Sequence, residues 1–318
     1  MQQNKPRIAV TMGDPAGVGP EVCLHLMAQQ SIRTICDPII FGDLAVLDAA
    51  AEKTGLANVK LSEVKNFEAI SLADFEPGKV NSFTGHAGYT YVREAIDAAL
   101  GGEIDGVATA PLNKEALAAA GIRFPGHTEI FAAKTGTEKY CMMQYSDIIT
   151  CSFVTTHCGY IEVPLLMTID RIEEVINLTR DAVKRIRAKE PKIVVLGLNP
   201  HSGENGLFGC KEEEERIIPA IERCREAGCD LEGPLPPDTA FLKWRLETTD
   251  AFICMYHDQG HIPVKALAFD KAVNTTLGLP FPRTSVDHGT ALDIAWQGKA
   301  NPSSLFEAVK LNAKLIGL

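Results

Sequence analysis

The stretch AFICMYHDQGHIPVK, residues 251–265, joins two features that together indicate the fold. Its first part, Ala251–Met255, is a short apolar run of the kind that forms a buried strand. The part that follows is predicted to be a short turn, and it holds four titratable residues: His257, Asp258, His261 and Lys265. A buried strand that ends in such groups is typical of an open α/β sheet, in which ligands bind beyond the carboxyl ends of the strands.

The same alternation of apolar runs and helical segments extends along the chain. Apolar runs predict strands at Arg7–Met12, Pro38–Phe41, Gly106–Ala110, Ile149–Thr155, Lys192–Leu198 and Ala251–Met255. Helical periodicity predicts helices at Pro20–Gln30, Leu44–Thr54, Tyr89–Leu100, Asn113–Ala119, Arg171–Lys189, Glu212–Ala227 and Pro302–Ile316. Strand followed by helix, repeated, indicates an α/β fold whose mostly parallel sheet is wrapped by helices.

The composition excludes several classes of function. With 318 residues, 46% hydrophobic and 23% charged, the chain is expected to be a soluble globular protein. A formal charge of −10 without a basic stripe argues against nucleic-acid partners, and no membrane partner is indicated. The polar N-terminus leads straight into a strand, so the cytoplasm is the expected location. Nine cysteines without a C-x-x-C pair favour neither a disulfide framework nor a thiolate zinc site.

Three histidines each follow a predicted strand. His157 ends CSFVTTH, His201 ends IVVLGLNPH and His257 ends AFICMYH. Because parallel strands share one carboxyl edge, the three imidazoles are expected to converge there. Three imidazole ligands leave positions on a divalent ion open for a substrate, which is a catalytic metal arrangement. The alternative is that each histidine separately caps a strand or bonds a loop carbonyl; His261 could support a ligand from behind.

A second group of residues suits an anionic ligand. PGHTE, Pro125 to Glu129, places His127 and Thr128 at a predicted helix start, where free N–H groups and the helix dipole favour negative charge. Lys265 and Arg283 follow the third histidine and could hold a phosphate or carboxylate. Taken singly, each of these residues is as readily a surface residue.

Two glycine-punctuated stretches complete the motifs. GDPAGVGPE, residues 13–21, is neither a Walker loop nor a G-x-G-x-x-G fingerprint, and a tight turn explains it equally well. DHGTALDIAWQGKANP, residues 287–302, combines a loop histidine with a helix start.

With these motifs, the chain resembles the 4-hydroxythreonine-4-phosphate dehydrogenase family over nearly its full length. The resemblance is carried by MGDPAGVGPE, GHTE, TTH, GLNPHSGENG, GPLPPDT, YHDQG and VNTTLGLPFPRTSVDHGTA. The first and last of these also resemble the turns with which isocitrate and isopropylmalate dehydrogenases bind a nicotinamide cofactor without a Rossmann glycine loop.

The resemblance implies a two-domain α/β/α subunit of the isocitrate and isopropylmalate dehydrogenase type. We expect a terminal domain from residues 1–130 and 285–318 and a central domain from residues 131–284. It further implies a homodimer whose active site lies at the subunit interface and draws on both chains.

Residue by residue, the resemblance assigns roles as well. It makes His157, His201 and His257 ligands of one divalent metal ion, to which both subunits contribute. It makes His127, Thr128, Lys265, Asn274 and Arg283 substrate contacts, and Asp287, His288, Gly289 and Thr290 part of the nicotinamide site. Three imidazoles accept Zn, Co, Ni or Mn, and the family also admits Mg. NAD is favoured, with NADP possible.

The expected reaction is metal-dependent oxidation of a 4-phosphorylated hydroxy acid of the 4-hydroxythreonine 4-phosphate type, as in vitamin B6 synthesis, followed by decarboxylation of the β-keto acid. Lys265 and Asp258 are candidates for proton transfer, although a lysine that clamps phosphate and an aspartate that orients a histidine are equally consistent.

One departure from the family keeps other substrates open. After TTH, biosynthetic members tend to continue with Leu-Pro-Leu, whereas this chain reads CGYIEVP, residues 158–164. Threonate or erythronate 4-phosphate and cyclic dihydrodiols are therefore alternative substrates. A non-catalytic sensor of phosphorylated metabolites and a metal-dependent phosphatase are further alternatives, but neither needs the DHGTA stretch.

Overall fold

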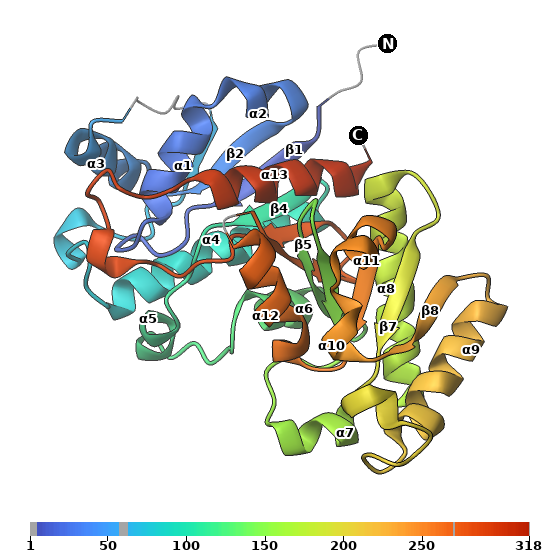
Figure 1. Ribbon diagram of the computed structural model, residues 1–318. Helices are drawn as coiled ribbons and strands as arrows, with labels where there is room; N and C mark the ends of the chain where they lie inside the picture. Colours follow the sequence, from blue (N-terminus) through green and yellow to red (C-terminus); the bar gives the residue numbers. More distant parts are fainter. Residues whose placement is uncertain (1–4, 57–62, 270, 318) are drawn as a thin grey trace. The chain divides into compact units, whose positions relative to one another are not determined.

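The computed structural model describes residues 5–56, 63–269 and 271–317 (Figure 1). The chain divides into two compact units, Met1–Glu138 with Leu279–Leu318, and Lys139–Gly278. The sequence analysis placed the corresponding boundaries at residues 130 and 285. The two units are called the terminal unit and the central unit below.

The terminal unit contains five strands that pair in parallel in the order β3-β2-β1-β4-β11. Residue Val10 of the central strand lies between Ile40 and Ala108. The strands are rich in buried apolar residues because both faces of a parallel sheet are covered by helices. Their bounds are Arg7–Thr11 (β1), Asp37–Gly42 (β2), Val64–Asn66 (β3), Gly106–Thr109 (β4) and Arg283–Ser285 (β11).

Two groups of helices pack on this sheet (Figure 1). One group comprises α1 (Gly19–Ala28), α2 (Gln30–Ile35), α3 (Leu44–Thr54) and α13 (Ser303–Ile316). The other comprises α4 (Ser82–Leu100), α5 (Lys114–Ala119) and α6 (His127–Thr135). Short 3-10 turns lie at Leu72–Asp74 and Leu292–Ile294.

Helix α4 begins at Ser82, seven residues before the predicted Tyr89. The sequence pattern did not indicate these first two turns because they contain glycines, which disfavour a helix. A Cβ atom at Gly85 would lie 2.1 Å from the carbonyl oxygen of Ala116 in α5. The two helices can approach this closely only because the side chain is absent. The glycines around His86 are typical of a loop, yet this residue is inside α4.

The central unit contains a mixed sheet in the order β10-β5-β6-β9-β7-β8. Strand β5 pairs antiparallel with both β10 and β6, whereas β6, β9, β7 and β8 run parallel. The bounds are Cys141–Tyr145 (β5), Thr150–Phe153 (β6), Lys192–Leu196 (β7), Asp230–Leu235 (β8), Ala251–Cys254 (β9) and Val273–Leu277 (β10).

Helix α8 packs on β5, β6, β9 and β10, and helix α12 packs on β6 and β9. The remaining helices are shorter and connect the strands. The helical bounds of this unit are Tyr160–Glu162 (η3), Val163–Leu166 (α7), Ile169–Arg187 (α8), Pro200–Gly203 (η4), Glu213–Ile217 (η5), Ile218–Glu226 (α9), Pro237–Ala240 (α10), Lys243–Thr248 (α11) and His257–Ala268 (α12).

Every predicted strand and helix is present, but the turn predicted after β9 was wrong. Residues His257–Ala268 form helix α12, with Pro263 inside it. Pro263 follows an apparent loop sequence of polar residues and Gly260, and this local pattern hid the helix. The helix places His257, His261 and Lys265 at successive four-residue steps, so that they follow one side of it.

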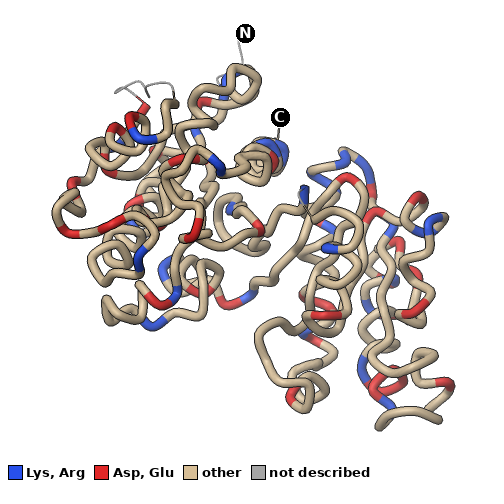
Figure 2. The backbone as a smooth tube through the Cα atoms, turned by 60° about the vertical axis from the view of Figure 1, so that its left-hand side comes forward, with Lys and Arg blue, Asp and Glu red and all other residues tan. Residues whose placement is uncertain are grey.

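No helix of the described residues is long and apolar enough to cross a membrane. Figure 2 shows acidic and basic residues interspersed along the backbone of each unit, and no continuous basic band is visible in the described part of the chain.

Candidate active site

The three predicted metal ligands follow three neighbouring strands of the central unit. His157 follows β6, His257 follows β9 and His201 follows β7, and β9 pairs in parallel with both of the others. The carboxyl ends of these strands therefore share one edge, as the sequence predicted.

His157 and His257 lie close together at this edge. Their ring centroids are 5.8 Å apart, and the ring of His257 packs against that of His261 with 3.9 Å between centroids and a tilt of 33°. His261 in turn stacks on Phe153, with 4.6 Å between centroids and 14° between planes. His261 is buried, and burial lowers its pKa to about 3, so this ring is neutral. The result is a column of rings that fixes the position of His257.

A carboxylate fixes the orientation of His257. The ring Nδ1 of His257 lies 2.7 Å from Oδ1 of Asp258, and the hydroxyl of Tyr160 donates to Oδ2 at 3.0 Å. These bonds from His257 and Tyr160 lower the pKa of Asp258. An ionised Asp258 holds the proton of His257 on Nδ1, which leaves Nε2 as an acceptor or metal ligand.

His201 lies in a left-handed turn after β7. Its φ is +53°, and Ser202, Glu204 and Asn205 also have positive φ values. The buried carboxylate of Glu213 accepts the backbone N–H groups of Leu198 and Asn199, each at 2.8 Å. The first residues of the turn are thus anchored to Glu213 of helix η5.

Imidazole nitrogens, such as those of the three histidines, are ligands that borderline divalent metal ions prefer. Among the described residues of this single chain, no group of three His, Cys, Asp or Glu side chains is placed to hold one. The chain brings His157 and His257 together with one ring nitrogen of His257 already oriented. A tetrahedral metal site would need at least one further protein ligand beside this pair.

Two predicted substrate residues, Lys265 and Asn274, belong to the central unit, as the three histidines do. Lys265 is exposed on α12, and its ammonium group lies 5.6 Å from the ring centroid of Phe269. Asn274 lies on β10 opposite Gln144, and its buried Oδ1 has no hydrogen-bond partner among the described residues. A buried amide oxygen left in this state is suited to a donor from a ligand or from water.

The terminal unit holds a buried cation. Arg283 begins β11 and is 1% exposed, and its guanidinium lies 5.3 Å from the ring of Phe131. One terminal nitrogen donates to the hydroxyl of Thr109 at 2.8 Å. Burial lowers the pKa of Arg283 to about 9. The planar guanidinium group suits bidentate binding of a phosphate or carboxylate.

Helix α6 begins beside this cation, as predicted. His127 and Thr128 are its first two residues, and Gly126 at the N-cap supplies no side chain to the first N–H groups. Burial, together with the charges of Arg283 and Lys114, lowers the pKa of His127 well below its usual value. A neutral His127 at a helix N-terminus can donate to an anion without adding charge.

The predicted cofactor residues lie against the first glycine-rich turn. Val18 donates its N–H to the carbonyl of Thr290 at 3.0 Å, and Asn113 donates to the Thr290 hydroxyl at 3.3 Å. His288 and Gly289 are exposed, and a Cβ atom at Gly289 would meet nothing within 4 Å. The space above this glycine is compatible with a flat cofactor. Asp287 is anchored by its backbone N–H, which donates to Ser304 at 3.2 Å.

Sequence reasoning missed the side chains that hold these residues in place. Tyr160, Glu213 and Gln259 each contact a segment that carries a predicted ligand. For Tyr160 a signal existed, because it lies in the CGYIEVP segment that departs from the family pattern.

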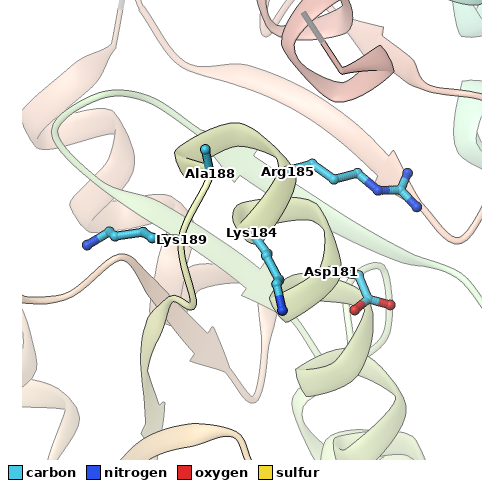
Figure 3. Close-up of a pocket in the computed structure, with 5 residues that line it drawn as sticks. All are labelled: Asp181, Lys184, Arg185, Ala188 and Lys189. Carbon is cyan, nitrogen blue, oxygen red and sulfur yellow. The ribbon is translucent and has the colours of Figure 1, made fainter.

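A hollow of about 520 Å³ lies at the end of α8. Figure 3 shows its lining side chains pointing apart, with Lys189 and Arg185 directed to opposite sides. Lys184 pairs with Glu190 at 2.9 Å and Lys189 with Asp250 at 3.1 Å. None of the predicted site residues lines this hollow, and two of the cations around it, Lys184 and Lys189, are paired with carboxylates.

Comparison with known proteins gives one consistent result. Residues 34–312 match the model of the family described as pyridoxal phosphate biosynthetic protein PdxA. The D-threonate 4-phosphate dehydrogenase of Cupriavidus necator is 41% identical, covering 99% of this chain and 98% of its own. The 4-hydroxythreonine-4-phosphate dehydrogenase of Desulfosudis oleivorans is 43% identical, covering 96% and 95%. The crystal structure of the Klebsiella pneumoniae 4-hydroxythreonine-4-phosphate dehydrogenase is similar with a TM-score of 0.87, at 38% identity over 98% and 100% of the two chains.

Proposed function

Because this chain belongs to the PdxA family of pyridoxal phosphate biosynthetic proteins, we propose that it oxidises the hydroxyl of a 4-phosphorylated hydroxy acid, with NAD or NADP as acceptor and one divalent metal ion. The oxidised product is a β-keto acid, which then loses carbon dioxide. The observation that carries the proposal is the oriented His257, held by Asp258 beside His157 at the shared strand edge.

The metal ion would be held by His157, His201 and His257, drawn from two copies of the chain. When bound, it supplies a positive charge that lowers the pKa of the substrate alcohol and stabilises the negative charge that develops as carbon dioxide leaves. The bond between His257 and Asp258 increases the electron-donating strength of this imidazole.

The other side chains act on the substrate itself. Arg283, with the helix start at His127 and Thr128, would bind the phosphate group, because buried positive charge and the positive end of the helix dipole favour a dianion. Lys265 would pair with a second anionic group or carry the proton that the alcohol releases. Asn274, with its buried Oδ1 lacking a partner in the described chain, would accept a hydrogen bond from a substrate hydroxyl or amine.

The nicotinamide cofactor would lie over the turn Asp287–Thr290, where the exposed Gly289 leaves room for it. This turn is held rigidly by the bond from Val18 to Thr290. A rigid turn sets the distance between the carbon that loses hydride and the ring that accepts it.

A specific observation supports threonate 4-phosphate as the second candidate substrate. Tyr160, within the segment that departs from the biosynthetic pattern, donates to Asp258 next to the predicted ligand His257. A relative at 41% identity is itself named for D-threonate 4-phosphate.

The assay that tests the proposal is reduction of NAD and of NADP by the full-length protein, loaded with zinc, cobalt, nickel, manganese or magnesium. The substrates are 4-hydroxythreonine, threonate and erythronate 4-phosphates, and a chelator-treated sample is the control. Turnover of at least one substrate that the chelator abolishes is expected. Absence of turnover with every combination, or turnover that survives chelation, contradicts the proposal.

Two substitutions separate the metal site from the fold. His201→Ala is expected to abolish turnover while leaving the circular dichroism spectrum unchanged. The matched control is His25→Ala, because His25 lies on α1 in the terminal unit and is not a predicted ligand. Near-normal turnover of His201→Ala would contradict the metal role of this residue.

A further inference from the structure

The strand ends that carry His257 and His201 are joined by one buried side chain. Gln259 lies in the first turn of α12 and is 6% exposed. Its Oε1 accepts the backbone N–H of Met255 at 2.6 Å, and its Nε2 donates to the carbonyl of Gly197 at 2.8 Å. Both ends of the amide are therefore used, and the orientation is fixed because Met255 can only donate there and Gly197 only accept.

The two bonds occur where the regular sheet ends. Strands β7 and β9 pair in register from Ile193 and Ala251 to Val195 and Ile253. Gly197 and Met255 lie two residues further along each strand, beyond the last paired residues. The amide of Gln259 thus replaces the backbone hydrogen bonds between β7 and β9 at the point where these two strands separate. Beyond this point each strand continues into the segment that carries its histidine.

The backbone groups of Met255 and Gly197 that do not contact Gln259 are hydrogen-bonded to residues at the ends of neighbouring strands. The carbonyl of Met255 accepts both the N–H and the hydroxyl of Thr155, at 3.2 and 2.7 Å. The N–H of Gly197 donates to Leu235 at 2.9 Å. Thr155 lies two residues before His157, so the connection reaches all three histidine-bearing strand ends.

We propose that Gln259 is a positioning residue, which fixes the backbone before His201 relative to the backbone before His257 and thereby sets the geometry in which the chain presents its metal ligands. The proposal rests on the proposed function, since it assumes that these histidines bind metal. A buried amide that satisfies two strand ends at once holds them more rigidly than apolar packing, because each lost bond leaves a buried polar group without a partner.

The test compares Gln259→Leu with Asn312→Leu in the full-length protein. Asn312 is a matched control in the terminal unit: it is 0% exposed, and its Nδ2 donates to the carbonyls of Val107 and Pro282 at 2.9 and 3.2 Å. Both substitutions remove a buried amide that joins strands, so both are expected to lower the melting temperature. Gln259→Leu alone is expected to weaken Zn²⁺ binding, by about tenfold or more, measured by competition with a chromophoric chelator.

A second variant separates the two bonds of Gln259. Gln259→Glu keeps an oxygen for the N–H of Met255 but places another against the carbonyl of Gly197. Hydrogen exchange is therefore expected to remain slow at Met255, while the amides of residues 198–209 exchange faster than in the unmodified protein. Zinc affinity is expected to fall in this variant too, because the Gly197 connection is the one that reaches His201.

The possible failures are distinguishable. Unmodified protein that binds no zinc, or that binds it equally well after His257→Ala, would overturn the proposed function. Unchanged exchange of residues 198–209 in Gln259→Leu would overturn the positioning role, whether or not zinc binds. Equal zinc affinities of Gln259→Leu and Asn312→Leu would overturn it as well.

Discussion

Replacement of Glu213 by leucine tests whether one buried carboxylate maintains the turn that carries His201. Glu213 is 1% exposed, and it accepts the N–H groups of Leu198 and Asn199 and the side-chain amide of Asn199, at 2.8, 2.8 and 2.9 Å. Leucine is similar in size but can accept none of these bonds. The substitution therefore removes three hydrogen bonds, and of the three donors only the side-chain amide of Asn199 keeps another acceptor, Glu212 at 2.9 Å.

The expected loss follows from these contacts. Each half-buried donor that loses its acceptor costs about 1 kcal/mol or somewhat more, and the bonds are strengthened here by the charge of the carboxylate. Three such bonds give a loss of about 3 kcal/mol in the free energy of unfolding. Glu213→Gln keeps one oxygen acceptor and removes the charge, so a loss of about 1 kcal/mol is expected.

The turn itself adds to this sensitivity. His201, Ser202, Glu204, Asn205 and Lys211 all have left-handed backbone conformations, with φ between +44° and +66°. A residue other than glycine in this region costs about 1 kcal/mol, so the turn stores strain that its anchoring bonds must oppose. Once the anchor is removed, relaxation of the turn is expected to move His201.

The assay is urea unfolding at neutral pH, followed by circular dichroism, with Glu215→Leu as the matched control. Glu215 lies in the same helix η5 but is exposed, so its replacement should change stability by less than about 0.5 kcal/mol. Hydrogen exchange should become faster at Leu198 and Asn199 in Glu213→Leu alone. Equal stabilities of Glu213→Leu and Glu215→Leu would refute the reasoning.

Three further predictions address packing, pH and anion binding. Gly85→Ala should destabilise the protein by about 3 kcal/mol in chemical unfolding, because the added Cβ would lie 2.1 Å from the carbonyl of Ala116; an unchanged midpoint would contradict the close approach. His127 is neutral in the fold but titrates near pH 6.5 when unfolded, so the free energy of unfolding should fall below that pH by up to about 1.4 kcal/mol per pH unit, and His127→Gln should flatten this dependence. Arg283→Met should remove the rise in melting temperature caused by inorganic phosphate while zinc affinity stays the same; a phosphate response equal to that of the unmodified protein would count against this anion site.

The sequence predicted the strand edge because the signal there is local. An apolar run followed by a histidine marks the end of a buried strand, and His157, His201 and His257 all show it. Strands β5 and β10 were missed because polar residues, among them Gln144 and Asn274, interrupt their apolar pattern. These strands are nevertheless buried, so packing within the sheet outweighed the local composition.

The contacts that position the site could not be predicted, because they join residues far apart in the chain. Gln259 bonds Gly197 across 62 positions, and Tyr160 bonds Asp258 across 98. No periodicity or spacing rule connects such pairs. The predicted ligands were found through family motifs. The residues that hold their segments in place, Gln259 and Tyr160, were found only through hydrogen bonds in the folded chain.

The three histidines are held by different means, and this difference has a consequence for the site. His257 is fixed by its own helix, by the ring of His261 and by Asp258. His157 is exposed and is tied through Thr155 to the same backbone. His201 lies in the irregular 3-10 turn η4, and no carboxylate among the described residues bonds its ring. Its position depends on this strained turn, anchored by Glu213, and on the strand end held by Gln259. Loss of either anchor should therefore affect the contribution of His201 before that of His257, so the metal site is expected to lose this ligand first as the fold is weakened.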